Sequence, residues 1–102
     1  MIYSLPDLAA KVKAVADQYD ILEIRLFGSY FDGVPTEESD VDLIVTYGAN
    51  CRGLDRFGFM NALEEHLGKE VDVLNIDFLP DFLTGDDLDT KSKLIYPYPN
   101  SA

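Results

Sequence analysis

Three aspartates have the types and the spacing to hold a metal ion. Asp40 and Asp42 are two residues apart in a stretch with strand character, so both carboxylates leave the same face of a sheet. Asp72 stands between two valines in a further predicted strand, and it completes a three-carboxylate cluster if the two strands are neighbours. Mg²⁺ prefers oxygen ligands, which usually include one or two carboxylates together with phosphate oxygens and water. The three aspartates therefore form a candidate magnesium site.

Gly28 and Ser29 supply a candidate phosphate site directly after a predicted strand. A glycine at this position lets the backbone approach a ligand closely, and the amides after it can bind an anion if they open a helical turn. The hydroxyl of Ser29 can donate one more hydrogen bond. Carboxylates beside a phosphate repel it unless metal ions lie between them, so the two halves of the pattern support one another.

The elements that must position these residues follow from periodicity and turn signals. Two helices and three strands are predicted first: a helix from Ser4 to about Tyr19, strands over Ile21–Phe27, Val41–Tyr47 and Val71–Ile76, and a helix over Leu54–Leu67. Residues 30–39 are predicted to form a loop that can open with one helical turn. The resulting fold class is α/β (α+β), with a small mixed sheet flanked by helices.

The remaining segments are less regular. The second helix is predicted to bury a stripe made by Phe57, Met60, Leu63 and Leu67. The apolar residues of the segment 78–83 either cover the sheet or form part of a protein interface. Residues 86–96 are expected to form a last helix. Residues 1–97 are predicted to be one domain, and residues 98–102 an extended C-terminal tail.

Composition narrows the classes of partner and location. The 102 residues allow one compact domain, and a formal net charge of −11 makes free DNA or RNA a poor substrate, while a basic protein would suit the surface. No apolar run has the length of a membrane helix, and the N-terminus lacks the layout of a signal peptide. The single cysteine, Cys51, cannot form an internal disulfide. A cytoplasmic location without membrane contact is therefore predicted.

Over about residues 20–77 the sequence resembles the minimal nucleotidyltransferases of the DNA polymerase β superfamily. The resemblance rests on Leu26–Gly33, Ser39–Val45 and Val71–Leu74, and on the spacing between the Gly-Ser turn and the Asp-x-Asp pair. It implies the nucleotidyltransferase fold and transfer of a nucleoside monophosphate, usually AMP from ATP, to a hydroxyl. It also implies that ATP is the co-substrate and that two Mg²⁺ ions are bound. The acceptor expected from it is a tyrosine of a small helical HEPN-type partner, for which such proteins act as antitoxins.

The resemblance also assigns residues. It makes Asp40, Asp42 and Asp72 the catalytic and metal-binding residues, and Gly28 and Ser29 the phosphate-binding turn. The family usually has basic residues shortly after this turn, whereas here the positions hold Tyr30 and Asp32.

Three readings therefore stand side by side. The first is an active nucleotidyltransferase. The second is a weak or inactive binding subunit that neutralises its partner by contact, which the replacement of the basic residues favours. The third, modification of a small molecule, would need an additional substrate-binding domain.

Overall fold

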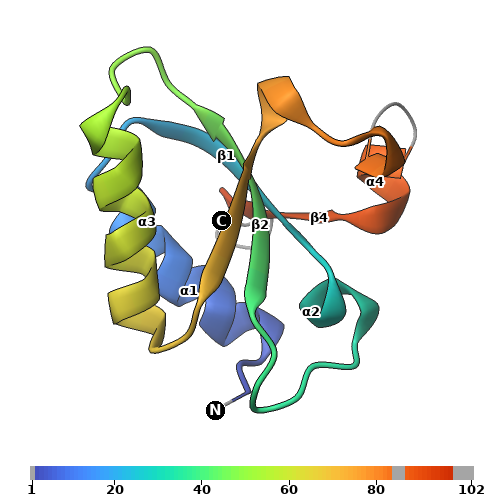
Figure 1. Ribbon diagram of the computed structural model, residues 1–102. Coiled ribbons are helices and arrows are strands. Elements are labelled where there is room, and N and C mark those ends of the chain that lie inside the picture. Colours follow the sequence, from blue (N-terminus) through green and yellow to red (C-terminus); the bar gives the residue numbers. More distant parts are fainter. Residues whose placement is uncertain (1, 84–86, 98–102) are drawn as a thin grey trace.

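A four-stranded mixed sheet in the order β3-β2-β1-β4 forms the centre of the fold (Figure 1). The computed structural model describes residues 2–83 and 87–97, and the side chain of Phe82 is not among what it describes. The elements in chain order are α1 (Leu5–Ala16), β1 (Ile21–Phe27), α2 (Ser29–Asp32), β2 (Val41–Tyr47), α3 (Leu54–Leu67), β3 (Val71–Asn75), the 3₁₀ turns η1 (Ile76–Phe78) and η2 (Asp81–Leu83), α4 (Asp87–Lys91) and β4 (Lys93–Tyr96). The mixed α/β class predicted from the sequence is confirmed.

Helix α1 begins where the sequence predicts and ends early. The Ser4 side chain accepts a hydrogen bond from the Asp7 backbone N–H at 3.3 Å, as an N-cap residue does. The predicted end near Tyr19 is wrong by about one turn. The N–H groups of Gln18 and Tyr19 donate to carbonyls three residues back, at 3.0 Å each, and these tighter bonds turn the chain into β1.

Strand β2 lies at the centre of the arrangement because it pairs on both sides. It runs antiparallel to β1 and parallel to β3. Helices α1 and α3 cover one face of the sheet (Figure 1), and the alternate residues Val41, Leu43 and Val45 of β2 join the core beneath them. Asp42 and Ile44 therefore belong to the opposite face.

The end of the chain differs from the prediction of a helix over residues 86–96. Of the described residues within 86–96, only Asp87–Lys91 is helical. Lys93–Tyr96 is a strand that pairs antiparallel with β1. Two long-range contacts explain this: Ile95 is fully buried, and the Arg25 Nε–H donates to the Ser92 hydroxyl oxygen at 2.8 Å. These partners lie far away in sequence, so local periodicity could not reveal them.

Helix α3 has the predicted bounds but a different buried stripe. Phe59, Leu63 and Leu67 are buried at a spacing of four residues, whereas Phe57 is 62% exposed. Met60 is only partly buried. The Phe59 ring meets the Tyr19 ring edge-on, with the two centroids 5.5 Å apart. The prediction of Phe57 as a core residue is wrong, because the helix is rotated to place Phe59 against the aromatic rings.

The segment 78–83 divides between the two roles considered for it. Leu83 at one end of the segment is buried within the fold, while Phe78 at the other end is 80% exposed. Within residues 2–83 and 87–97, no helix is both long and apolar enough to cross a membrane. Residues 98–102 lie outside the described part of the chain, so the predicted boundary between domain and tail stays a prediction.

The rotation of α3 gives a direct test of the core. Phe59→Ala should lower the free energy of unfolding by about 3–5 kcal/mol, because it opens a cavity in a fully buried site. Phe57→Ala, two residues away in the same helix, should change it by no more than about 0.5 kcal/mol. Urea denaturation followed by circular dichroism measures both values. Equal losses in the two variants would contradict the observed stripe.

Candidate active site

Two of the three predicted carboxylates are brought together by the sheet register. Asp42 pairs with Asp72 across the parallel ladder of β2 and β3, and with Phe27 across the antiparallel ladder of β1 and β2. Paired residues on neighbouring strands project from the same face, so the Asp42 and Asp72 side chains lie next to each other. This face is the one opposite to α1 and α3. Asp40 stands immediately before β2, two residues from Asp42, and is near enough for its charge to act on Asp42.

The pKa of Asp42 is shifted because its carboxylate is partly buried and lies close to other carboxylates. Its pKa is raised to about 6, first by burial, then by the adjacent Asp72 carboxylate as hydrogen-bonding partner and as like charge, and last by the charge of Asp40. No ion pair formed between described residues involves any of the three carboxylates. Nor do three or more potential metal ligands come close enough together, among those residues, to form a ready-made cage. The structure thus places the carboxylates as neighbours that repel one another.

The Asp42 side chain lies so close to Gly28 that there is no space for a Cβ atom at this position. A Cβ atom added to Gly28 would lie 2.1 Å from one Asp42 carboxylate oxygen, so any side chain there would displace the carboxylate. Its φ of 74° and ψ of −152° also belong to a backbone region that is essentially restricted to glycine. Helix α2 opens directly after it. The sequence predicts that the glycine leaves space for a ligand. The structure shows that the missing side chain also leaves space for the Asp42 carboxylate.

The loop before Asp40 is held by a lysine that the sequence motifs do not include. The Lys69 ammonium donates to the backbone carbonyls of Glu37 at 2.8 Å and of Ser39 at 3.2 Å. One residue further on, the Val41 N–H donates to the Glu70 carbonyl at 3.0 Å. These bonds join the segment that precedes Asp40 to the segment that precedes Asp72. No signal in the sequence marks Lys69, because its partners are backbone carbonyls about 30 residues away.

The two positions that depart from the family pattern lie in α2 and differ in burial. Tyr30 is half-buried and packs against the core, and its hydroxyl oxygen lies 3.4 Å from the Tyr3 backbone N–H that donates to it. Asp32 is exposed and borders a hollow of about 390 Å³ next to the Gly28 turn. The residues that line this hollow are Phe27, Gly28, Asp32, Leu83 and Lys91.

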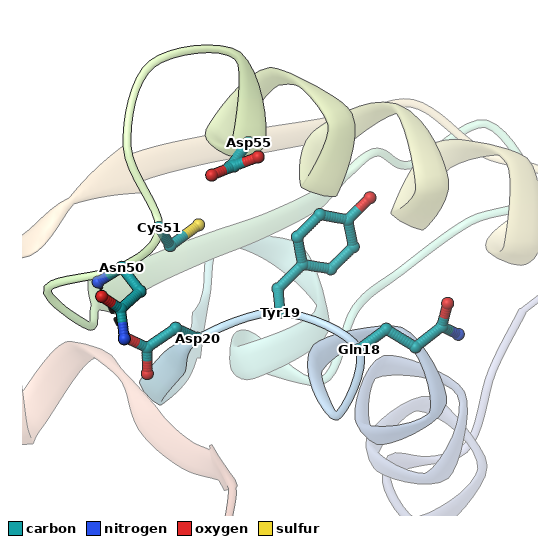
Figure 2. Close-up of a pocket in the computed structure, with 6 residues that line it drawn as sticks. All are labelled: Gln18, Tyr19, Asp20, Asn50, Cys51 and Asp55. Carbon is teal, nitrogen blue, oxygen red and sulfur yellow. Dashed lines mark hydrogen bonds between the residues drawn. The ribbon is translucent and has the colours of Figure 1, made fainter.

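A second hollow, of about 250 Å³, lies at the other end of β1 and β2 (Figure 2). Figure 2 shows the side chains that line it gathered between the loop before β1 and the loop that leads to α3. Asp20 joins these loops, since its carbonyl accepts from the Gly48 N–H at 2.8 Å and its carboxylate from the Asn50 N–H at 2.9 Å. Cys51 is 1% exposed, and burial raises the pKa of its thiol. The arrangement therefore suits joining of the loops rather than thiol chemistry.

Comparison with known proteins identifies one family over most of the chain. The sequence matches the family described as "Polymerase beta, Nucleotidyltransferase" over residues 10–98. It is 34% identical over 67 residues to protein adenylyltransferase MntA of Thermococcus cleftensis, and this match covers 66% of the chain and 68% of the relative.

Solved structures of similar proteins share the fold. One described as a minimal nucleotidyltransferase has a TM-score of 0.71 and 29% identity, over 88% of this chain and 94% of that one. A chain in the complex of the tri-AMPylated Shewanella oneidensis HEPN toxin with its MNT antitoxin has a TM-score of 0.65, over 90% of this chain and 71% of that one. At 19% identity, this second likeness concerns the fold alone.

The contact between Gly28 and Asp42 can be separated from backbone strain. Gly33 also has a positive φ, of 80°, but nothing lies within 4 Å of its added Cβ. Gly33→Ala should therefore cost about 1–2 kcal/mol of stability through strain alone. Gly28→Ala should cost about 3 kcal/mol or more, because a glycine-only backbone region and the displaced carboxylate act together. Thermal unfolding measures the stabilities, and NMR titration of Asp42 should show a lowered pKa only in Gly28→Ala. Equal effects of the two substitutions would contradict the contact.

The raised pKa of Asp42 predicts a specific pH dependence. A carboxyl whose pKa is higher in the folded than in the unfolded state binds a proton on folding, so its unfavourable effect fades as pH falls through about 6. With chelator present, Asp42→Asn should melt above wild type at pH 7.5, and the gap should close towards pH 4.5. Differential scanning calorimetry across this range measures the gap. A constant gap would show that Asp42 does not titrate in it.

Proposed function

Because the chain belongs to the polymerase β-type nucleotidyltransferase family and is an enzyme of that class, we propose that it transfers AMP from ATP to a hydroxyl of a partner protein. The observation behind this proposal is the pairing of Asp42 with Asp72, next to the Gly28 turn and without a neutralising cation in the described residues. Like charges in that position are unfavourable for the protein by itself. They become favourable when a cation and a phosphate share the site.

The donor set fits magnesium. It consists of carboxylate oxygens, the ligand type that Mg²⁺ takes with phosphate oxygens and water, and it has no thiolate or imidazole that would favour zinc. In the proposal Asp40, Asp42 and Asp72 hold the metal, and two ions are bound with the triphosphate. When bound, the ions would supply Lewis-acid activation of the acceptor hydroxyl and neutralise charge on the phosphates.

The remaining steps fall to side chains and backbone of the chain itself. The backbone N–H groups at the start of α2 have no intrahelical acceptor, so with the Ser29 hydroxyl they can hold phosphate oxygens. The acceptor oxygen attacks the α-phosphorus, the bond to the β-phosphate oxygen breaks, and pyrophosphate leaves. Asp72 accepts the hydroxyl proton in this scheme. It is exposed on β3, a strand at the edge of the sheet, so a protein acceptor can reach it.

The partner in the proposal is a small HEPN-type helical protein, and the acceptor is one of its tyrosines. The support is the solved complex in which an MNT antitoxin binds a tri-AMPylated HEPN toxin, together with the relative named as a protein adenylyltransferase. A net charge of −11 suits a basic protein surface and disfavours free nucleic acid. In this role the chain is the antitoxin of a cytoplasmic toxin–antitoxin pair.

One observation favours the alternative of a binding subunit that acts by contact. Asp32 is exposed on the hollow beside the Gly28 turn, where the family usually has a basic residue, and a negative charge there repels a triphosphate. A protein that only covers its partner would tolerate this charge. The two functions differ in whether AMP becomes covalently attached.

The proposal is tested by nucleotide binding and by labelling. Mg²⁺ with ATP should raise the melting temperature, and ATP with chelator should not, because the carboxylates repel phosphate without a metal. Labelled AMP should be incorporated into a co-purified partner by wild type and by Asp77→Asn, which removes an exposed carboxylate beyond the other end of β3. Asp42→Asn should abolish both the Mg²⁺-dependent shift and the labelling.

Two outcomes would contradict the proposed metal-dependent transfer of AMP. Partner binding without any AMP incorporation by wild type would establish the binding subunit. Equal melting shifts with and without chelator would reject a metal-bridged nucleotide, whatever the labelling shows.

A further inference from the structure

The two peptide groups on either side of Asp40 are each held by a hydrogen bond. The Ser39 carbonyl, which precedes Asp40, accepts from the Lys69 ammonium at 3.2 Å. The Val41 N–H, which follows Asp40, donates to the Glu70 carbonyl at 3.0 Å. A residue has only two soft backbone torsions, and they are set by the peptide planes on its two sides. These two bonds therefore fix the direction in which the Asp40 side chain leaves the backbone.

The turn that leads to Asp40 is also bonded within itself. The Thr36 N–H donates to the Ser39 hydroxyl oxygen at 2.8 Å, and the Ser39 N–H donates to the Thr36 carbonyl at 3.1 Å. The Lys69 ammonium reaches this turn at a second point, the Glu37 carbonyl, at 2.8 Å. Lys69 therefore attaches the turn as a unit to the segment that precedes β3.

Lys69 itself stands on a fixed backbone at the end of α3. Gly68, in the left-handed conformation with a φ of 67°, donates its N–H to the Glu64 carbonyl at 2.9 Å. The Val71 N–H donates to the Glu64 carboxylate at 3.1 Å. Lys69 thus lies between two residues that are both bonded to Glu64. Asp72 follows directly, so the lysine that holds Asp40 belongs to the segment that carries Asp72.

We propose that Lys69 is a positioning residue for the candidate magnesium site, which sets Asp40 relative to Asp72 so that both carboxylates can bind the metal. This role rests on the proposed function. Lys69 acts through the backbone of Asp40 and touches neither the metal nor the nucleotide. Residues that orient metal ligands in this way typically change metal affinity by about 10–100-fold when they are replaced.

Charge and position predict opposite effects of losing Lys69. Removal of a cation from the neighbourhood of Asp40 makes the site more negative, which by itself strengthens the binding of Mg²⁺. Release of the Asp40 backbone weakens binding, because the carboxylate then has to be ordered when the ion binds. The proposed role requires the second effect to be the larger one, so the sign of the change in Mg²⁺ affinity is decisive.

The test compares two lysines whose ammonium groups are both bonded. Lys13 lies exposed on α1, which covers the other face of the sheet, and it donates to the Asp17 carboxylate at 2.6 Å. Equilibrium dialysis with labelled ATP at a series of Mg²⁺ concentrations gives the concentration for half-maximal ATP binding. Lys69→Met should raise it about tenfold, and saturating Mg²⁺ should restore ATP binding. Lys13→Met should change it less than about twofold, because that charge is remote and screened.

A conservative variant and a measurement without metal sharpen the result. Lys69→Arg should keep most of the Mg²⁺ affinity, because a guanidinium can donate to both carbonyls. In protein without metal or nucleotide, the Val41 amide should exchange its hydrogen about tenfold faster in Lys69→Met than in wild type, since the hydrogen bonds to the charged group are lost. The amides of residues 43–45, in the middle of a strand paired on both sides, should not change. Circular dichroism verifies that each variant is folded.

The outcomes separate the role of Lys69 from the function on which it rests. If wild type binds Mg²⁺–ATP and Lys69→Met needs the same or less Mg²⁺, Lys69 does not position the site, and the proposed function stands. An equal loss in Lys69→Arg, a loss that saturating Mg²⁺ does not restore, or unchanged exchange at Val41 would also overturn the role. If wild type shows no Mg²⁺-dependent binding of ATP, the proposed function falls, and the role of Lys69 in metal binding falls with it.

Discussion

The contact between the Asp42 carboxylate and the backbone of Gly28 is the constraint on which the rest of the site depends. It requires an unsubstituted Cα at position 28, a backbone conformation open to glycine, and a strand order that places β2 next to β1. Because β2 is also paired with β3, the same register that sets Asp42 against Gly28 sets it beside Asp72. One lateral row across three strands therefore contains a turn, a half-buried carboxylate and an exposed carboxylate. A shift of one residue in the pairing of β2 with β1 would turn Asp42 towards the core.

The helices explain why this row can exist on one face. The apolar side chains that pack with α1 and α3 come mainly from alternate residues of β1 and β2, among them Ile24, Leu26, Leu43 and Val45, with further residues from β3 and β4. The main core therefore lies on this face of the sheet and not on the opposite one. Polar groups gather at the end of the opposite face, where the loops before Asp40 and Asp72 meet and Lys69 joins them. Packing on one side and chemistry on the other are the two consequences of a strand period of two.

What the sequence could predict is what local patterns determine. The strands over 21–27 and 41–47 and the helix over 54–67 follow from periodicity, and the structure confirms them. The shared face of Asp40 and Asp42 stays a prediction, because Asp40 lies just before β2. The errors have long-range causes. Strand β4 forms because Ile95 is buried in the core and Ser92 accepts a hydrogen bond from Arg25. Phe59, not Phe57, is the buried residue because its ring packs against Tyr19, which is distant in sequence. In the candidate site, Gly28 and Ser29 can be recognised from their spacing to Asp40, whereas Lys69 cannot, because its hydrogen-bond partners lie about 30 residues away.

The distribution of charge links the acidic composition to the proposed chemistry. The segment from residue 26 to residue 51 holds five acids and no lysine or arginine, so the motif region alone would repel the substrate assigned to it. Asp42 shows the cost in the absence of metal, since its raised pKa means that the folded protein holds this carboxylate at a disadvantage. A cation relieves that disadvantage only while it is bound, and a phosphate can follow only after the charge is neutralised. Metal and nucleotide binding should therefore be mutually dependent to a greater degree than at a site whose own residues are basic. On this view the acidic turn makes binding conditional on magnesium rather than removing it.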